Sequence, residues 1–424
     1  MMNSLVIADL FLLLFLGLAD NQMIAALLPA LVKSFGISLS TAGRAVVVYS
    51  LAAGVAAFVT GPLSDRYGRR RFLLMGVVLF ALASFGSAHS RTFPQFILAR
   101  TLTGLAAGAL STCSITYAAD WFPYNVRGRA IGLISASYFA APILGVPIAA
   151  QLASHFGWRS AFLFFAVLAI VVAIASLRLP REAKVRSPKS PVRSPELEIR
   201  NPESEANTSQ VRSPASADGS KFGAALLAFR SFLTRRDTAA ALVIAFLVSG
   251  GLVGFLTYIG AWLNGRFGLS TGAIGYVFML GGAVAVGSAH LGGMVSDRWG
   301  KRTVSMGSNL ILALSVAAVP FLPWGIGLLC VFALASLGAA FRQGPLTALM
   351  TEMVPAAQRG SFIALRNISS QLGIGATVYA GGLLFQRSGY AAVTSLCAAM
   401  TLVVVVLLAT HIVEPGDVAW PSRP

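Results

Sequence analysis

The chain has 424 residues, of which 56% are hydrophobic and 11% charged, and its mean hydropathy is +0.76. A soluble domain carries about 25% charged residues, so this chain has too few charges to cover a water-facing surface of its size. The composition excludes a soluble enzyme, a disordered protein and a disulfide scaffold as the main body, and it predicts a polytopic membrane protein. The net charge of +17, which would suggest nucleic-acid binding in a soluble protein, instead indicates which side of the bilayer the loops occupy.

Twelve apolar stretches are each long enough to cross a bilayer as a helix, which takes about 20 residues. They cover residues 4–31, 42–64, 71–90, 94–119, 129–154, 158–179, 238–264, 272–296, 302–322, 325–351, 360–386 and 389–413. The first stretch has neither a basic segment before it nor a small-residue cleavage site, so we interpret it as a retained span rather than a signal peptide. We therefore expect an all-α membrane protein with twelve transmembrane helices.

The connection between the sixth and seventh stretches is long and differs in composition. Residues 181–221 are rich in Ser, Pro and charge, with the tetrapeptide VRSP repeated, and predict a disordered spacer. Apolar residues at positions 222, 226, 229 and 233 then favour either a short amphipathic helix in the headgroup region or an extension of the seventh span. The expected organisation is a six-helix bundle at 1–179, a cytoplasmic linker at 180–237, a second six-helix bundle at 238–413 and a cytoplasmic tail at 414–424.

The two bundles match each other at a constant offset of 232 residues. Ser64-Asp65-Arg66 pairs with Ser296-Asp297-Arg298, Gly68 with Gly300, and Arg127-Gly128 with Arg359-Gly360. Six spans return the chain to its starting side, so the unit is duplicated in parallel, an arrangement typical of transporters. Loops on the side of the termini carry ten Lys and Arg residues against six on the opposite side, before the basic linker is added. The positive-inside rule therefore predicts cytoplasmic termini in an inner membrane.

The loop between the second and third spans reads GPLSDRYGRRR, and its counterpart in the second bundle reads GGMVSDRWGKR. Both resemble the signature of the major facilitator superfamily, and the resemblance covers essentially the whole chain outside the linker. We expect Gly61 to let a neighbouring helix approach closely and Gly68 to support a tight reversal. The resemblance implies a conformational latch between the two halves, formed by Gly61, Asp65, Arg66, Gly68, Arg69, Arg70, Gly293, Asp297, Arg298, Gly300 and Lys301.

Three further stretches are similar to motifs of this family. The fourth span reads LARTLTGLAAGA, which resembles the motif of an intramembrane Arg before a Gly-xxx-Gly packing face. The fifth reads AAPILGVP, similar to the Pro-Gly element of drug:proton antiporters, with Ala141 where that pattern usually has Gly. The first reads LADNQMIAALLP, which resembles the acidic motif of twelve-span drug antiporters and metabolite efflux proteins. The helix-packing residues expected from these motifs are Gly104, Gly108, Pro142, Gly145 and Pro147.

Asp20 lies deep in the first span, and Arg100 lies at a comparable depth in the fourth. A carboxylate at the centre of a span costs about 2.5–3.5 kcal/mol on insertion scales, so it needs a partner or a wet cavity. The resemblance implies that spans 1, 4, 7 and 10 line a central cavity where the two side chains could meet. Burial favours the neutral carboxyl and a nearby Arg favours the ionised form, so a cycle that joins and separates them would load and release a proton. The alternative is a static ion pair that locks the two spans.

The second bundle has Leu252 at the position that corresponds to Asp20. The candidate substrate-cavity residues are Asn21, Gln22, Tyr258, Asn264, Arg342, Gln343 and Arg366. One acid against two or three arginines disfavours dications and favours neutral, amphipathic or anionic cargo. Arg342 could instead be buried against a carbonyl group, Arg366 could reach the cytoplasmic interface, and we interpret His290 as a packing residue.

The sequence as a whole predicts a secondary transporter that works by alternating access, with proton-coupled efflux of small organic molecules. A uniporter, a symporter or a lipid translocase of the same fold for neutral or anionic cargo is the alternative. No G-x-x-x-x-G-K-[ST] motif occurs, which excludes a built-in ATP motor, and scattered histidines with short loops argue against a membrane enzyme. The three cysteines lack metal spacing, so we expect no metal and no cofactor. The expected partners are a small-molecule substrate, protons and the lipid bilayer, without nucleic acid, for a monomeric protein.

Overall fold

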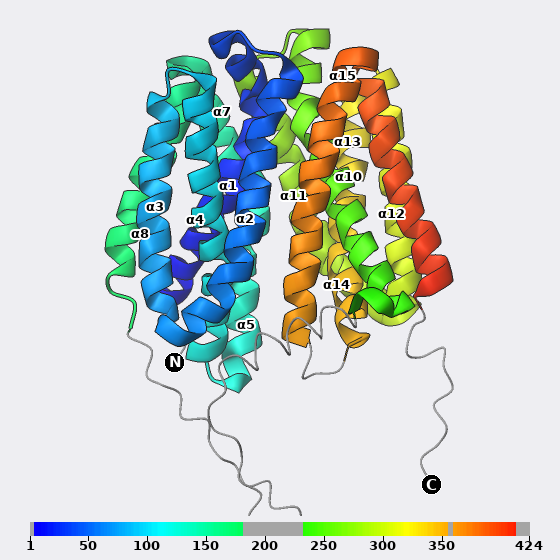
Figure 1. Ribbon diagram of the computed structural model, residues 1–424. Coiled ribbons are helices and arrows are strands. Elements are labelled where there is room, and N and C mark those ends of the chain that lie inside the picture. Colours follow the sequence, from blue (N-terminus) through cyan, green and yellow to red (C-terminus); the bar gives the residue numbers. More distant parts are fainter. Residues whose placement is uncertain (1–3, 181–231, 355–358, 413–424) are drawn as a thin grey trace, which may run out of the picture.

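The computed structural model describes residues 4–180, 232–354 and 359–412, and every regular element among them is a helix (Figure 1). The first half contains α1 (Ser4–Phe35), α2 (Leu39–Tyr67), α3 (Arg69–His89), α4 (Phe93–Trp121), α5 (Tyr124–Ser135), α6 (Ser137–Ala140), the π-helical turn η1 (Ala141–Gly145), α7 (Val146–Phe156) and α8 (Trp158–Ser176). The second half contains α10 (Arg236–Phe267), α11 (Thr271–Trp299), α12 (Lys301–Ala318), the 3-10 turn η2 (Val319–Phe321), α13 (Ile326–Phe341), α14 (Gln343–Glu352) and α15 (Arg359–His411). The predicted all-α fold is confirmed.

Eleven helical segments in these described ranges are long and apolar enough to cross a membrane. The last of them supplies two crossings, because Gly389 (φ 77°) interrupts the 53 residues of α15. Figure 1 shows the chain rising in orange to this point and returning in red. The described residues therefore make the twelve crossings that the sequence predicts.

Two of the crossings are broken, which the sequence patterns did not indicate. The fifth consists of α5, α6, η1 and α7, and Pro142 and Pro147 lie in and just after its π-helical turn. The tenth is divided at Arg342 into α13 and α14. Proline lacks the N–H that would bond to the carbonyl four residues earlier, and Pro345 in this way leaves the carbonyl of Phe341 without its helical partner. The break therefore places Arg342 at a helix end inside the bundle.

The ends of the crossings define two faces of the molecule. We call the face where α1 begins and α15 ends the terminal face, and the opposite one the far face; the terminal face is at the bottom of Figure 1. The reversals from α2 to α3 and from α11 to α12 lie at the terminal face. They use Gly68 (φ 94°) and Gly300 (φ 86°), in a backbone region that glycine adopts without steric penalty. The predicted spacer, most of the predicted amphipathic helix and the tail at 414–424 lie outside the described residues.

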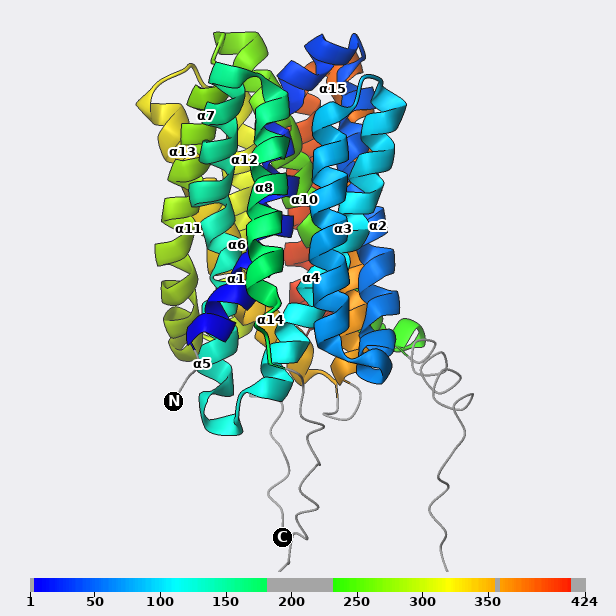
Figure 2. The same cartoon turned by 90° about the vertical axis from the view of Figure 1, so that its left-hand side faces the viewer.

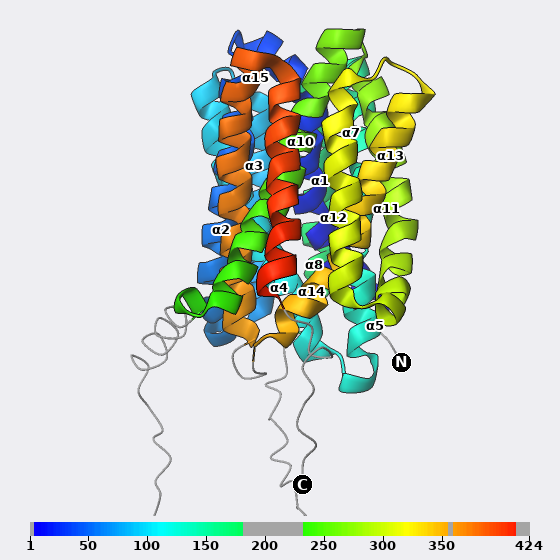
Figure 3. The ribbon, with the colours of Figure 1, turned by 90° about the vertical axis from the view of Figure 1, so that its right-hand side faces the viewer.

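The two halves contact each other through α2 against α15, α7 against α11 and α1 against α10 (Figures 2 and 3). The Oγ of Ser40 donates a hydrogen bond of 2.9 Å to Oε1 of Gln386 at the far face. A Cβ atom on Gly260 would lie 2.2 Å from the carbonyl oxygen of Ala25, so the backbones of α10 and α1 nearly touch. Both contacts lie in the parts of the helices nearer the far face, so the far side of the molecule is closed.

The contact between α7 and α11 uses the prolines that the sequence marked for packing. A Cβ on Gly275 would lie 3.2 Å from Cα of Pro147, and one on Gly282 would lie 3.1 Å from Cγ of Pro142. Glycines of α11 thus make room for the broken fifth crossing, so Pro142 and Pro147 pack between the halves.

The other predicted packing residues lie inside the first half. A Cβ on Gly104 would lie 2.4 Å from the carbonyl oxygen of Tyr49, and one on Gly108 would lie 2.2 Å from that of Ala53. Since both are backbone atoms of α2, the two helices could not approach this closely with any larger residue. Gly145 has the same relation to α1, because its Cβ would lie 2.4 Å from the side chain of Ala19.

Candidate functional site

A buried ion pair joins α1 to α4 in the first half. Nη1 of Arg100 lies 2.5 Å from Oδ2 of Asp20, and both side chains are fully buried. Asp20 is midway along the 32 residues of α1, far from either face. The structure therefore brings together the two residues that the sequence predicted to meet.

The surroundings of the pair are aromatic and leave several polar atoms unsatisfied. The guanidinium carbon of Arg100 lies 4.7 Å from the ring centre of Tyr49 and 5.7 Å from that of Phe162. The hydroxyl of Tyr49 donates a 2.7 Å hydrogen bond to the carbonyl of Gly17 on α1, which fixes the ring. Oδ1 of Asp20 and Nε and Nη2 of Arg100 have no hydrogen-bond partner among the described residues. Arg100 is thus held by one carboxylate oxygen and two aromatic rings. Neither ring was predicted, because the motifs of the first and fourth spans, which identified Asp20 and Arg100, do not include Tyr49 or Phe162.

This arrangement makes the pair sensitive to protonation of Asp20. Two buried charges are tolerated because each offsets the desolvation of the other, and removal of one leaves the other uncompensated. A proton on Asp20 would remove its charge, and the guanidinium would then keep only the two aromatic contacts. Protonation of Asp20 would therefore weaken the contact between α1 and α4.

A second buried guanidinium lies in the other half, at the break between α13 and α14. Arg342 is 1% exposed, and its Nη1 donates to Oδ1 of Asn309 on α12 at 2.5 Å. Its Nη2 donates to the carbonyl of Val248 on α10 at 3.2 Å, whereas Nε has no partner in the described ranges. In the described part of the chain no carboxylate pairs with Arg342, so this is a buried cation held by neutral oxygens. The alternative of burial against a carbonyl group is therefore the one that the structure shows, and Arg342 does not line a cavity here. Asn309 was not among the predicted residues, since an Asn inside a helix carries no distinctive sequence signal.

A small hollow lies beside Arg342, between α10, α14 and α15. Its volume is about 50 Å³, and its polar lining consists of Ser249, Gln343, Thr347, Arg366 and Ser370. Val248, whose carbonyl accepts from Arg342, also lines it. Gln371, which follows Ser370 on α15, has its Cβ 3.1 Å from the position that a Cβ on Gly54 of α2 would occupy, so the hollow lies near the contact between the halves. Two predicted cavity residues, Gln343 and Arg366, thus share one site.

The remaining predicted cavity residues are dispersed. Asn21 and Gln22 are half-buried beside Asp20 on α1. Tyr258 is fully buried and donates to the carbonyl of Val378 at 2.7 Å, so here it packs in the closed far-face interface and does not line a cavity. The prediction for Asn264 was wrong, because this residue is exposed in the last turn of α10, where its amide donates to the carbonyl of Leu269 at 2.9 Å.

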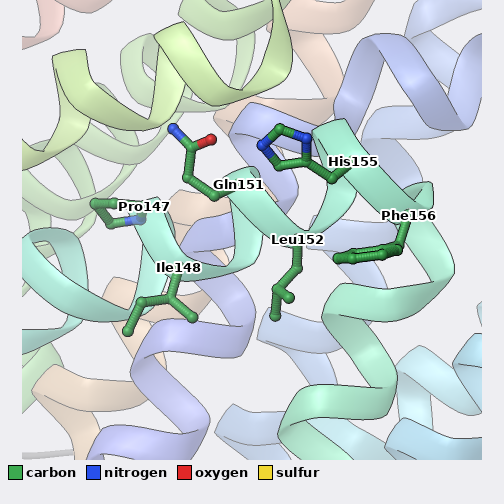
Figure 4. Close-up of a pocket in the computed structure, with 6 residues that line it drawn as sticks. All are labelled: Pro147, Ile148, Gln151, Leu152, His155 and Phe156. Carbon is green, nitrogen blue, oxygen red and sulfur yellow. The ribbon is translucent and has the colours of Figure 1, made fainter.

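A larger hollow, of about 320 Å³, does not belong to this site. Its lining residues are Pro147, Ile148, Gln151, Leu152, His155 and Phe156, and Figure 4 shows all six on one stretch of α7. Phe156 is 76% exposed, so the hollow is an apolar groove on the surface of α7. Within the described ranges no group of three His, Cys, Asp or Glu residues could hold a metal ion, and the side chain of His290 is not among the described ones.

The predicted latch loops form contacts inside one half. Arg69 pairs with Asp65 at 2.8 Å and with Asp120 of α4 at 2.6 Å, and Arg70 donates to the carbonyl of Leu177 at the end of α8. These contacts of the two arginines stay within the first half, and the latch between the halves that the resemblance implies remains a prediction.

The second half repeats the arginine contact of Arg70. Arg302 donates to the carbonyls of Leu408 and Ala409, so each arginine caps the last crossing of its own half. The close approach expected at Gly61 is also absent, because no described atom lies within 4 Å of a Cβ built on Gly61 or on its counterpart Gly293. The reason is that the close contacts between the halves lie toward the far face, away from these glycines.

Comparisons with known proteins give consistent results. Residues 10–338 and 285–424 match the family model described as Major Facilitator Superfamily. The chain is 26% identical over 392 residues, 92% of this chain and 87% of the relative, to the uncharacterized MFS-type transporter YwfA of Bacillus subtilis. It is 31% identical over 175 residues, 41% of this chain and 39% of the relative, to the 4-hydroxybenzoate transporter PcaK of Pseudomonas aeruginosa. The fold matches the inward open conformation of the xylose transporter XylE from E. coli with a TM-score of 0.73, at 16% identity and 96% coverage of both chains.

Proposed function

Because the chain belongs to the Major Facilitator Superfamily, we propose that it exports small organic molecules in exchange for protons. Membership of the family makes the chain a multi-pass membrane transporter of small molecules rather than an enzyme. The proposal about protons rests on one observation, the buried ion pair between Asp20 and Arg100.

In the proposed cycle Asp20 carries the proton. Protonation removes the attraction to Arg100, whose guanidinium then remains between the rings of Tyr49 and Phe162. Loss of the proton restores the ion pair and tightens α1 against α4. One proton moving down a potential of 100 mV and a gradient of one pH unit supplies about 3.7 kcal/mol, which supports a roughly 500-fold concentration ratio of a neutral cargo.

The proposed movement is alternating access, in which the halves rock about the site between them. We assign the terminal face to the cytoplasm, because its loops carry the larger share of Lys and Arg. The far-face contacts, such as Ser40 with Gln386, would then close the outer side, and the molecule would be open to the cell interior. In this state an exporter can collect its cargo.

The alternative is that Asp20 and Arg100 form a static lock between α1 and α4 in a uniporter, a symporter or a lipid translocase. Oδ1 of Asp20 has no hydrogen-bond partner among the described residues, so it can take up a proton without breaking a hydrogen bond, which favours a pair that changes over a pair that only stabilises. PcaK, which is named for an aromatic carboxylate, supplies a first substrate to try.

The test is transport by the purified full chain in proteoliposomes, with the variant Asp20→Asn. We expect the wild type to move labelled 4-hydroxybenzoate, or a member of a panel of neutral aromatic compounds, against its gradient when a pH gradient is imposed. Asp20→Asn should lose this uphill transport and retain exchange of labelled for unlabelled cargo, because the neutral amide imitates the protonated state.

The control is Asp237→Asn, which removes an acid whose ion pair with Arg235 is half exposed. This variant should transport like the wild type. Undiminished uphill transport by Asp20→Asn would refute the proton role and leave the static lock. Uphill movement of the cargo only into the compartment of lower pH would indicate exchange for protons. Uphill movement only out of that compartment would indicate symport.

A further inference from the structure

The arginines of the second half differ from Arg100 in one respect, because they lack an acid. Arg100 has Asp20 at 2.5 Å. Arg342 has only the amide oxygen of Asn309 and a backbone carbonyl, and no ion pair joins Arg366 to an acid in the described ranges. Isolated buried charges are strongly unfavourable unless a counter-ion completes them. The second half therefore has an excess of positive charge within its helices, on the side nearer the terminal face, that a bound anion would balance.

The hollow beside these arginines has the size and lining for the charged end of an anion. Its volume of about 50 Å³ exceeds the roughly 30 Å³ share of one water in the liquid and lies far below the ~300–1,000 Å³ of a whole ligand pocket. The guanidinium of Arg366 and the hydroxyl of Ser370 lie one helical turn apart on α15, and Ser249, Gln343 and Thr347 complete the polar lining. None of the described residues that line it is an acid.

Arg342 supports this hollow from behind one wall. The hydrogen bond from its Nη2 to the carbonyl of Val248 fixes the segment of α10 that lines the hollow. The hydrogen bond from its Nη1 to Asn309 holds the same guanidinium against α12. Because Arg342 is 1% exposed, its charge is poorly screened by water and adds to the positive potential in the hollow. Gln371, which follows Ser370 on α15, packs against Gly54 of the first half, so the hollow lies near the contact between the halves.

We infer that this hollow, between α10, α14 and α15, binds the carboxylate of an organic monoanion, with Arg366 as the pairing group and Arg342 as a fixed supporting charge. The inference deepens the proposed function, on which it rests for the presence of a small-molecule cargo, and it does not depend on proton coupling. The planar guanidinium of Arg366 can donate two parallel hydrogen bonds to a carboxylate, and the hydroxyl of Ser249, which also lines the hollow, can donate to a remaining lone pair.

The test compares benzoate with benzamide, which share shape and differ in charge, as ligands of the full chain in neutral phosphatidylcholine nanodiscs. We expect benzoate to raise the midpoint of thermal unfolding with concentration and benzamide to have no effect. Arg366→Gln should weaken the Kd for benzoate by about tenfold or more, because a charge-assisted bond is lost, and Arg366→Lys should weaken it less. The control is Arg387→Gln, which removes an exposed arginine of the same helix at the far face and should bind like the wild type.

Three results would overturn the inference: equal effects of benzoate and benzamide, wild-type affinity in Arg366→Gln, or stabilisation by added phosphatidylglycerol without any by benzoate. The last result would assign the site to a lipid headgroup. Asp20→Asn should bind benzoate like the wild type, because the hollow does not depend on the proton. Undiminished uphill transport in this variant would refute the proton proposal and leave the hollow in place. Absence of benzoate binding to the wild type, together with uphill transport of a neutral compound, would refute the hollow and leave the proton proposal in place.

Discussion

Disruption of the ion pair between Asp20 and Arg100 should have a large and non-additive effect on stability. Both groups are fully buried and joined at 2.5 Å, and breaking such a pair by removing one partner costs about 3–5 kcal/mol because the other charge stays buried. Arg100→Gln leaves a buried carboxyl group that can become neutral by taking up a proton. Asp20→Asn leaves a buried guanidinium that cannot lose its charge and keeps only two aromatic rings, which retain about 1–2 kcal/mol. We therefore expect Asp20→Asn to be the more destabilising of the two.

The double variant Asp20→Asn/Arg100→Gln completes the cycle. Two neutral amides can hydrogen bond to each other, so its destabilisation should be smaller than the sum of the single effects by about 3 kcal/mol. The assay is equilibrium unfolding of all four proteins in mixed micelles, titrated with denaturing detergent and followed by circular dichroism and tryptophan fluorescence. Additivity of the two substitutions within about 0.5 kcal/mol, or equal effects of both single variants, would refute this description of the pair.

Three other substitutions test the packing around this site. Tyr49→Phe should cost about 1 kcal/mol, because it loses the hydrogen bond to Gly17 and keeps the ring over the guanidinium, whereas Tyr49→Leu should cost a further 1–2 kcal/mol in the same unfolding assay; equal costs would exclude a cation–π contribution. Gly104→Ala should destabilise by about 1–3 kcal/mol through overpacking against α2, whereas Gly128→Ala, where no described atom lies within 4 Å of the added Cβ, should change the unfolding midpoint little. Arg70→Gln should speed amide hydrogen exchange in the last turn of α8, since it removes the donor to Leu177; unchanged exchange there would show that the cap contributes nothing.

The number of crossings and the ion pair could be predicted from the sequence because both depend on scarce features. Charges are rare in apolar stretches, so Asp20 and Arg100 were conspicuous. Their similar depths, together with the resemblance that implies that spans 1 and 4 line one cavity, predicted that they could meet. The reversals at Gly68 and Gly300 were equally accessible, since a glycine repeated at the ends of two equivalent helices indicates a backbone conformation that other residues adopt only with strain.

The neighbours of the two buried arginines could not be predicted from the sequence, because they depend on how the helices pack against one another. Tyr49 and Phe162 are two of many aromatic residues in the spans, and only the packing of α2 and α8 around α4 brings them to Arg100. Asn309 acquires its role only because the break before Pro345 turns Arg342 toward α12. Asn264 was misplaced for a different reason, because it lies in the last turn of α10 at the far face, where its side chain is exposed.

The two halves retain a common scaffold and have diverged in charge. Arg70 and Arg302 cap equivalent helix ends at the offset of 232 residues, so the duplicated skeleton is still held by the same contacts. The charged core differs, because Phe332 occupies the position equivalent to Arg100 and packs against Phe255 and Phe278.

This divergence gives each half a separate electrostatic property. In the proposed mechanism a proton uncouples the cation of the first half from its acid, and an external anion completes the cations of the second half, which no described acid pairs with. The two events would bias the same rocking movement from opposite halves of the molecule. Coupling between proton and cargo then needs no direct contact between them, because each changes the free energy of the same conformational equilibrium.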